Sequence, residues 1–150
     1  MQRGAHVTAV GDTDKLDMVE RLGAHRAVDH RHEDFTADTQ RYHLVFDSVG
    51  KAGWKRCRPL VADGGWFMAT EFGDRFENVT APMITMRSAQ RAAFPVPRKT
   101  REHVKFIASL LASGDFDPVH DRTFDLDDIV EAYRYIETGQ KTGNVALRMG

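Results

Sequence analysis

The chain has the length and composition of one soluble domain. Its 150 residues can bury a core, but they are too few for a nucleotide-binding domain together with a substrate domain. Acidic and basic residues nearly cancel, 22 against 21, so the strong positive charge of a nucleic-acid-binding protein is absent. No apolar run approaches the roughly 20 residues that a membrane span needs. We therefore expect neither nucleic acid nor a membrane as a partner.

Cysteine and histidine usage bounds the location and the metal chemistry. Cys57 is the only cysteine, which excludes an internal disulfide and a zinc site built on cysteine pairs. The N-terminal residues contain no apolar signal region, so a cytoplasmic location is expected. His30, His32 and Glu33 could form at most a weak surface metal site, since polar loops of this kind are usually only solvated. We predict no metal site.

The first half of the chain alternates strands with helices. Short β-branched runs predict buried strands, and apolar residues at helical spacing predict the helices between them. In chain order the sequence predicts a strand over 6–11, a helix over 13–22 ended by Gly23, a strand over 27–29 and a polar loop or irregular helix over 30–41. A strand over 44–46, a helix over 54–60, a turn over 63–65 and a strand over 66–70 follow. This alternation predicts a parallel sheet covered by helices on both faces.

The second half contains two helices and a final strand. The prolines of Phe94–Pro97 permit only an edge strand or an extended connection. Helices are predicted over 100–113 and 125–138, each followed by glycine, with a polar turn over 114–122 between them. Residues 144–149 form the final strand. The side chains expected to point inward are Val104, Ile107, Leu110 and Leu111 in the first helix, and Leu126, Ile129, Val130, Tyr133 and Ile136 in the second.

Three strand exits are the candidate binding regions, because ligands of doubly wound sheets bind at the carboxyl ends of the strands. They are residues 11–15, 47–50 and 70–73. Lys15 lies in a helix's first turn, where a bound phosphate would offset the unfavourable helix dipole, but a solvated lysine balanced by nearby aspartates explains it equally well. Asp12 can cap that helix, and it can also accept hydrogen bonds from an adenosine ribose and repel an added 2′-phosphate, so it leaves the choice between NAD and NADP open. Gly50 either allows close approach of a ligand or serves the dihedral angles of a turn.

Familiar catalytic patterns are lacking. No G-x-S-x-G nucleophile motif occurs in the sequence. Asp127 and Asp128 lie in the first turn of a predicted helix, where the helix dipole alone favours acids. We predict no catalytic residue in this chain.

Five segments, taken in order, resemble the cofactor domain of the medium-chain dehydrogenase/reductase superfamily, nearest to its quinone oxidoreductase-like and zinc-binding alcohol dehydrogenase members. They are HVTAVGDTDK, RLGAHRAVDHRHEDF, YHLVFDSVGKAGWKRC, LVADGGWFMA and PVHDRTFDLDDIVEAYRYIETGQKTGNVAL, which cover nearly the whole chain. The resemblance implies an α/β fold with a doubly wound parallel sheet of Rossmann type, incomplete at its N-terminal strand and helix.

The resemblance also implies what these residues do not include. The family's glycine-rich turn, which cradles the pyrophosphate, would precede His6, and its catalytic domain with any zinc ligands would lie further upstream. Residues 1–150 are thus expected to form a single partial dinucleotide-binding domain. Residues 140–150 would be a closing strand that packs toward the missing catalytic domain.

The family's cofactor is NADP or NAD, and the resemblance places it at the strand exits. Lys15 resembles the lysine that meets the adenosine 2′-phosphate of NADPH, whereas Asp12 stands where Ser or Thr is common. Without the pyrophosphate cradle we expect weak binding by this chain alone, and we expect no zinc. The predicted cofactor-binding residues are Asp12, Thr13, Lys15, Asp47, Ser48, Val49, Gly50, Thr70, Phe72 and Gly73.

Three functional hypotheses remain. The leading one is the C-terminal cofactor-domain portion of an NAD(P)H-dependent quinone or enone reductase or alcohol dehydrogenase, inactive alone. The alternative is a degenerate stand-alone remnant that acts as a non-enzymatic binding or interaction module. A third, an unrelated doubly wound enzyme such as a methyltransferase, has no motif in its favour. The expected partners are the nicotinamide cofactor, a second chain or the missing N-terminal half, and further copies in a homo-oligomer.

Overall fold

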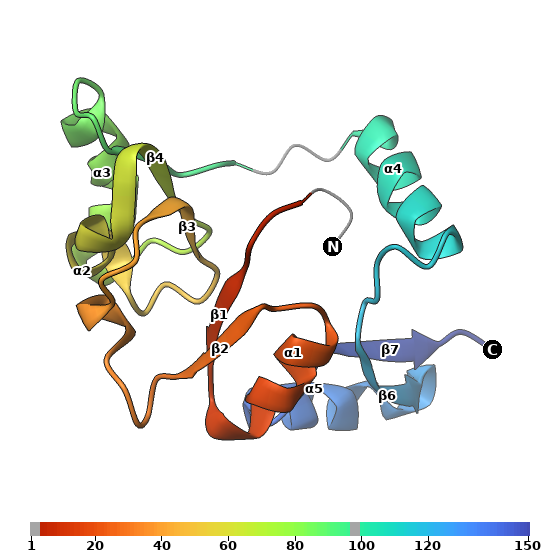
Figure 1. Ribbon diagram of the computed structural model, residues 1–150. Coiled ribbons are helices and arrows are strands. Elements are labelled where there is room, and N and C mark those ends of the chain that lie inside the picture. The colour runs from red at the N-terminus through yellow and green to blue at the C-terminus, as the bar shows by residue number, and fades with distance from the viewer. Residues whose placement is uncertain (1–3, 97–99) are drawn as a thin grey trace. The chain divides into compact units, whose positions relative to one another are not determined.

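A computed structural model describes residues 4–96 and 100–150 of the chain. The chain forms two compact units, one of Met1–Ala27 with Lys99–Gly150 and one of Val28–Arg98. Strands and helices alternate along the chain (Figure 1). β3 pairs with β4, β4 with β5 and β6 with β7, and all three pairs are parallel. These features confirm the predicted α/β fold. No helix within the described ranges is long and apolar enough to cross a membrane.

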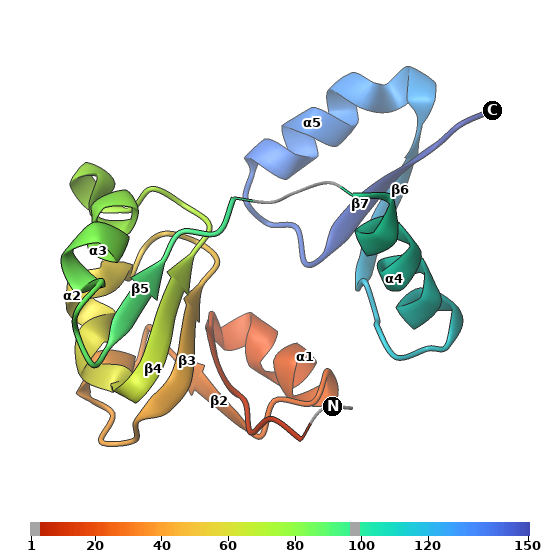
Figure 2. The ribbon, with the colours of Figure 1, turned by 90° about the horizontal axis from the view of Figure 1, so that it is seen from above.

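The unit Val28–Arg98 is built on a three-stranded parallel sheet. Its strands are β3 (Tyr42–Asp47), β4 (Val61–Ala69) and β5 (Arg91–Ala93), in the order β3-β4-β5. Helices α2 (Gly53–Cys57) and α3 (Glu77–Thr85) lie side by side on one face of this sheet (Figure 2). Single turns of 3-10 helix occupy Phe35–Ala37, Arg58–Leu60 and Asp74–Phe76.

The core of this unit lies between the sheet and its two helices. Alternate residues of a strand face opposite sides, so Phe67 and Ala69 of β4 point into the core and are 1% and 0% exposed. They pack there with Trp54, Cys57, Val61, Ala81 and Ala92. On the other face, Leu44 and Phe46 of β3 remain 53% and 54% exposed. Both faces of the sheet are therefore apolar, as parallel sheets usually are, and α2 and α3 cover one of them.

The turn predicted over residues 63–65 is a bulge inside β4. The register of β3 against β4 shifts between Tyr42, opposite Val61, and Leu44, opposite Trp66. Gly64 has φ +77°, and a Cβ on Gly65 would lie 2.8 Å from the carbonyl oxygen of Ala62. The two glycines let β4 absorb extra residues without ending, so the strand is longer than predicted.

Two elements, α3 and β6 (His120–Asp125), were absent from the sequence prediction. An edge strand or an extended connection was predicted at Phe94–Pro97, and the structure has a strand, β5, directly before these residues. Pro97 lies outside the described residues. β6 occupies part of the stretch predicted as a polar turn, and it pairs in parallel with β7 (Asn144–Arg148), the predicted final strand.

The other unit contains the predicted first strand and the two long helices. β1 (Thr8–Gly11) is followed by a 3-10 turn at Thr13–Lys15, which leads into α1 (Leu16–Arg21). β2 (Arg26–Asp29), which pairs with β1, begins in this unit and ends in the unit Val28–Arg98. α4 (Arg101–Ala112) starts at a Thr100 cap that accepts a hydrogen bond from the backbone N–H of His103. A 3-10 turn at Leu126–Asp128 precedes α5 (Ile129–Glu137).

The inward faces predicted for these two helices need correction. α4 buries none of its residues, and its Val104 is 64% exposed. In α5 the buried residue is Ala132, whereas Val130 and Tyr133 are 57% and 62% exposed. The helical periodicity predicts which side of each helix is apolar, but it does not predict how much of that side other elements bury.

We predict that Cys57 is nearly inert in the folded chain. Its burial, with a contribution from the nearby Asp47 carboxylate, raises the pKa of the thiol to about 11. At about pH 8 such a thiol is roughly 100-fold less ionised than an ordinary one, and the thiolate is the reactive form. An aromatic disulfide reagent should therefore react at least about 100-fold more slowly with the native chain than with the denatured chain. Comparable rates would contradict the packing of α2 against β4.

Candidate functional site

The loop that follows β3 is organised by one carboxylate. Oδ1 of Asp47 accepts hydrogen bonds from the backbone N–H groups of Val49 at 3.1 Å and Gly50 at 2.8 Å. Oδ2 accepts from those of Ala52 at 3.2 Å and Gly53 at 3.1 Å. Asp47 is 9% exposed, so the four bonds are largely shielded from water. The carboxylate fixes the course of the chain from the end of β3 to the start of α2.

A buried asparagine joins this loop to the one that follows β4. Oδ1 of Asn78 accepts from the backbone N–H of Trp54, and Nδ2 donates to the carbonyl of Glu71. The side chain is 1% exposed. Thr70 adds a direct link, because its backbone N–H donates to the carbonyl of Asp47 at 3.3 Å. The exits of β3 and β4 are therefore held together at one edge of the sheet.

Glycines at the two exits are required by this packing. Gly50 has φ +74°, and a Cβ there would lie 2.4 Å from Cβ of Glu71. Gly73 has φ +68°, and a Cβ there would lie 2.7 Å from Nδ2 of Asn78. The close approach at Gly50 is thus an approach of protein to protein, and its backbone also needs the left-handed region.

Aromatic side chains gather where β4 and β5 end. The ring of Phe72 stacks on that of Phe94, with centroids 5.7 Å apart, and tilts against Phe76 at 5.6 Å. Phe76 adopts φ +60°, which is uncommon for a residue other than glycine. Phe72 and Phe76 are 57% and 62% exposed. The exit of β4 thus presents an apolar, aromatic surface.

The exit of β1 belongs to the other unit and has different chemistry. Asp12 occupies the cap position of the following turn with extended backbone, and its carbonyl accepts from the N–H of Lys15 at 2.9 Å. Its side chain makes no capping hydrogen bond. Nζ of Lys15 lies 2.9 Å from Oδ2 of Asp14 and donates a hydrogen bond to Oγ1 of Thr142. The lysine predicted to meet a phosphate is thus anchored from two sides.

The structure brings together several of the predicted residues within each unit. Asp47, Ser48 and Thr70 are in contact, since the hydroxyl of Thr70 also donates to the carbonyl of Ser48 at 3.4 Å. Val49 points its side chain outward and is 65% exposed. Two further residues of these regions, Asn78 and Thr142, were not predicted. Asn78 carries no recognisable motif, whereas Thr142 lies in the family-like segment E-T-G-Q-K-T-G-N-V.

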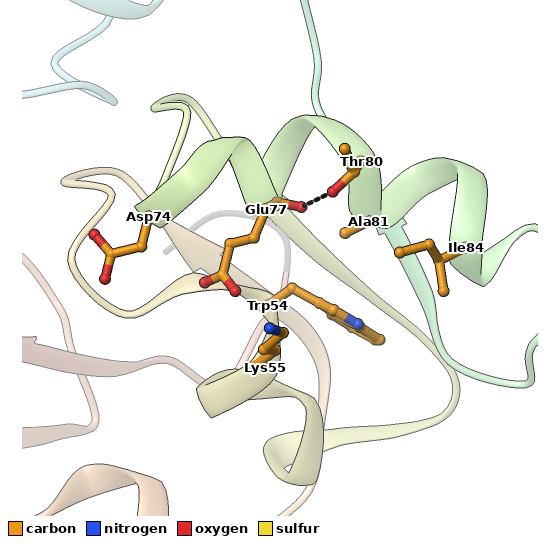
Figure 3. A pocket seen from close by; sticks show the side chains of 7 residues that line it. All are labelled: Trp54, Lys55, Asp74, Glu77, Thr80, Ala81 and Ile84. Atoms are coloured by element: carbon orange, nitrogen blue, oxygen red, sulfur yellow. Dashed lines mark hydrogen bonds between the residues drawn. The ribbon is translucent and has the colours of Figure 1, made fainter.

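A pocket of about 390 Å³ lies between α2 and α3 (Figure 3). It is lined by Trp54, Lys55, Asp74, Glu77, Thr80, Ala81 and Ile84, none of which was predicted to bind a cofactor. Of the histidines considered as metal ligands, His32 has its Nδ1 2.8 Å from Oδ2 of Asp29. Within 4–96 and 100–150, no group of three His, Cys, Asp or Glu residues is placed to hold a metal ion.

Comparison with known proteins identifies the family of the chain. Residues 22–147 match the family described as zinc-binding dehydrogenase. The chain is 30% identical over 143 residues to 2-methylene-furan-3-one reductase of Solanum lycopersicum, covering 94% of the chain and 33% of that protein. It is 27% identical over 143 residues to a chloroplastic NADPH-dependent alkenal/one oxidoreductase of Arabidopsis thaliana, with 94% and 33% coverage.

A solved structure shows the same fold. The quinone oxidoreductase of Coxiella burnetii superposes with a TM-score of 0.84 at 19% sequence identity, over 99% of this chain and 46% of that one. The chain thus spans about a third of the length of these curated relatives and under half of this structural neighbour. Since the family match extends over most of its residues, the chain belongs to the zinc-binding dehydrogenase family, which confirms its predicted relationship to the medium-chain dehydrogenase/reductase superfamily.

Proposed function

We propose that the chain is the C-terminal cofactor-domain portion of an NAD(P)H-dependent oxidoreductase of the quinone or enone reductase or alcohol dehydrogenase type. The proposal rests mainly on one observation: Asp47 and Asn78 connect the loops that follow β3 and β4 through hydrogen bonds. The chain in which they do so belongs to the zinc-binding dehydrogenase family. Carboxyl ends of parallel strands are where such sheets bind nucleotides. The names of the two plant relatives, a furanone reductase and an NADPH-dependent alkenal/one oxidoreductase, support the same reaction class.

Each unit by itself offers groups that suit part of a nicotinamide dinucleotide. Lys15 offers a cation whose side chain is 25% exposed, suited to a phosphate on the adenosine ribose. At the β3 exit, Ser48 and Val49 are exposed and would meet the ligand. The Asp47 carboxylate already accepts four backbone hydrogen bonds, so we assign it the role of ordering this loop rather than of contacting the ligand.

The cofactor, when bound, supplies the hydride that reduces a carbonyl or a conjugated alkene. The residues of this chain bind and orient it. We place Thr70, Phe72 and Gly73 nearer the nicotinamide end, where the exposed phenylalanine ring offers an apolar surface. No strand, glycine-rich turn and helix precede β1 within these 150 residues, so the backbone donors that hold a pyrophosphate are not supplied here.

The assigned role of Asp47 predicts a stability effect. Asp47→Ala leaves buried backbone N–H groups without acceptors, and we expect the free energy of unfolding to fall by about 2–4 kcal/mol. Asp47→Asn keeps one acceptor oxygen and should lose roughly half as much. Denaturant titration measures the free energy of unfolding of both variants. The control is Asp63→Asn, at an exposed position of β4, whose free energy of unfolding should lie within about 0.5 kcal/mol of that of the unaltered chain. Equal effects at positions 47 and 63 would contradict the role of Asp47 in ordering the loop after β3.

The incomplete fit predicts weak and localised cofactor binding. NADPH and NADH should bind the 150-residue chain no more tightly than about millimolar, equivalent to about 4 kcal/mol of binding free energy. In an NMR titration the shifted backbone signals should include residues 13–15, 48–50 and 70–73. Shifts confined to other residues would contradict the proposed site, and micromolar affinity would contradict the need for a glycine-rich turn.

We also expect no turnover by this chain alone, because none of its residues is assigned a catalytic role. NADPH oxidation with a panel of quinones and conjugated enones should stay at the background rate. The control is the same assay after Lys15→Met, which should give an identical trace. Turnover that this single substitution lowers would show that the chain is active by itself.

A further inference from the structure

The pocket between α2 and α3 contains none of the residues that the proposed function uses, and it lies wholly within the unit Val28–Arg98. Its lining follows one side of α3, because Glu77, Ala81 and Ile84 recur at helical spacing. A helix rises about 1.5 Å per residue, so Glu77 and Ile84 stand roughly 10 Å apart along it. The lining therefore extends over about two turns of α3, with Trp54 and Lys55 of α2 on the other wall (Figure 3).

One end of the pocket is acidic. The side chains of Asp74 and Glu77 lie at the N-terminal end of α3, and Ile84 lies at the opposite end (Figure 3). Neither carboxylate forms an ion pair within residues 4–96 and 100–150. The hydroxyl of Thr80 donates to the carbonyl of Glu77 at 3.2 Å, so its oxygen keeps lone pairs with which to accept. This end therefore offers three hydrogen-bond acceptors, two of them charged.

The wall formed by α2 carries a buried hydrogen-bond donor that has no acceptor. Trp54 is 8% exposed, and its ring packs against that of Phe67 with centroids 5.8 Å apart. Its indole N–H has no hydrogen-bond partner among the residues that the structure describes. No fully enclosed polar side-chain atom of those residues lacks a partner, so this N–H reaches open space, and the space that Trp54 lines is the pocket. Such a donor needs an acceptor from a ligand or from water.

These groups together define the chemistry of a ligand. A primary ammonium has three N–H donors, which match the acceptors of Asp74, Glu77 and Thr80. An aliphatic chain attached to it would lie along Ala81 and Ile84, and an acceptor at its far end would receive the indole N–H of Trp54. A metal ion would leave this N–H and the apolar wall unused, and the described residues place no group of three His, Cys, Asp or Glu around one.

We propose that this pocket binds a linear organic cation, a primary ammonium on an aliphatic chain that ends in a hydrogen-bond acceptor. Asp74 and Glu77 attract the ammonium, Thr80 accepts one of its hydrogens, and Trp54 donates to the far end. Lys55 lines the same pocket and is the competing cation. A free amine and a lysine side chain of a peptide share this chemistry. The inference is independent of the proposed function, since no cofactor contact takes part in it.

The test compares three probes: aminohexanol, which has both ends, hexylamine, which lacks the acceptor, and hexanediol, which lacks the cation. NMR titration of the 150-residue chain follows the indole N–H signal of Trp54 and the backbone signals of residues 77–84. Aminohexanol should bind with a dissociation constant of about 1 mM, hexylamine about 3-fold more weakly and hexanediol at least about 10-fold more weakly. The indole signal of Trp66, which lies outside the lining, is the internal control and should not move.

Charge variants test the acidic end. Glu77→Gln and Asp74→Asn should each weaken aminohexanol binding about 3-fold to 5-fold, since each removes a charged acceptor. Lys55→Gln should strengthen it about 3-fold, and because this side chain is exposed the gain does not depend on a weakened fold. Asp63→Asn, at an exposed acid of β4 outside the lining, is the matched control and should change nothing. A loss with Asp63→Asn equal to that with Glu77→Gln would reduce the effect to general charge and overturn the proposal.

Trp54→Phe tests the other end, because it keeps an aromatic ring in the core and removes the N–H. Aminohexanol and hexylamine should then bind equally, as the backbone signals of residues 77–84 report, and a difference that persists would overturn the role of Trp54. Hexanediol that binds the unaltered chain as tightly as aminohexanol would overturn the cation site itself.

A last probe identifies the source of the ammonium. Nα-acetyl-lysine N-methylamide carries the same ammonium on a lysine side chain, with a backbone carbonyl as the acceptor. Tighter binding than that of aminohexanol identifies a lysine side chain of a peptide as the occupant, and weaker binding identifies a free amine. Failure of all the amines to bind would overturn the proposal and leave the proposed function untouched, because NADPH and NADH are titrated against other residues.

Discussion

The unit Val28–Arg98 depends on the carboxylate of Asp47. Where β3 ends, the chain turns away from the sheet, and its backbone N–H groups still need acceptors. The carboxylate of Asp47 accepts hydrogen bonds from four of these N–H groups, and its charge strengthens each bond. The strand pairing adds to this, because the carbonyl of Asp47 accepts from Thr70 of the neighbouring exit. Asn78 then connects the ordered loop to the segment after β4, so both exits form one hydrogen-bonded assembly.

That assembly explains the glycines of the segment D-S-V-G-K-A-G. Gly53 has φ +67°, and a Cβ there would lie 1.6 Å from Oε1 of Glu77, which begins α3. At Gly50 a Cβ would meet Glu71 in the same way. Of the two roles considered for Gly50, turn geometry and ligand approach, the structure supports the first and adds close packing by a neighbouring loop. Glycines at the end of a strand can therefore be required by close packing between neighbouring loops as well as by ligand binding.

Regular periodicity made most of the fold predictable, and its absence accounts for what was missed. The strands at residues 8–11 and 42–47 and the helix at 101–112 follow simple patterns that the sequence displays. α3 was missed because ENVTAPMIT carries a proline at Pro82 and β-branched residues, which argue against a helix unless packing compensates. Its burial of Asn78, Ala81 and Thr85 provides that compensation. The contact of Lys15 with Thr142 could not be predicted from spacing, because it depends on how β6, α5 and β7 fold together.

Under the proposed function, the exits differ in what a ligand must displace. At β3 and β4 the polar backbone groups bind Asp47 and Asn78, so a ligand meets a formed surface and little further ordering is required. At β1 an incoming phosphate must compete with Asp14 for the ammonium of Lys15, which is an exchange of one anion for another. Binding by such an exchange depends on the charge and position of each partner, whereas binding to the preformed surface depends mainly on the shape of the ligand. Under the proposed function, recognition of a ribose phosphate would therefore depend on the charges around Lys15, and recognition of the rest of the dinucleotide on the shape of the loops that Asp47 organises.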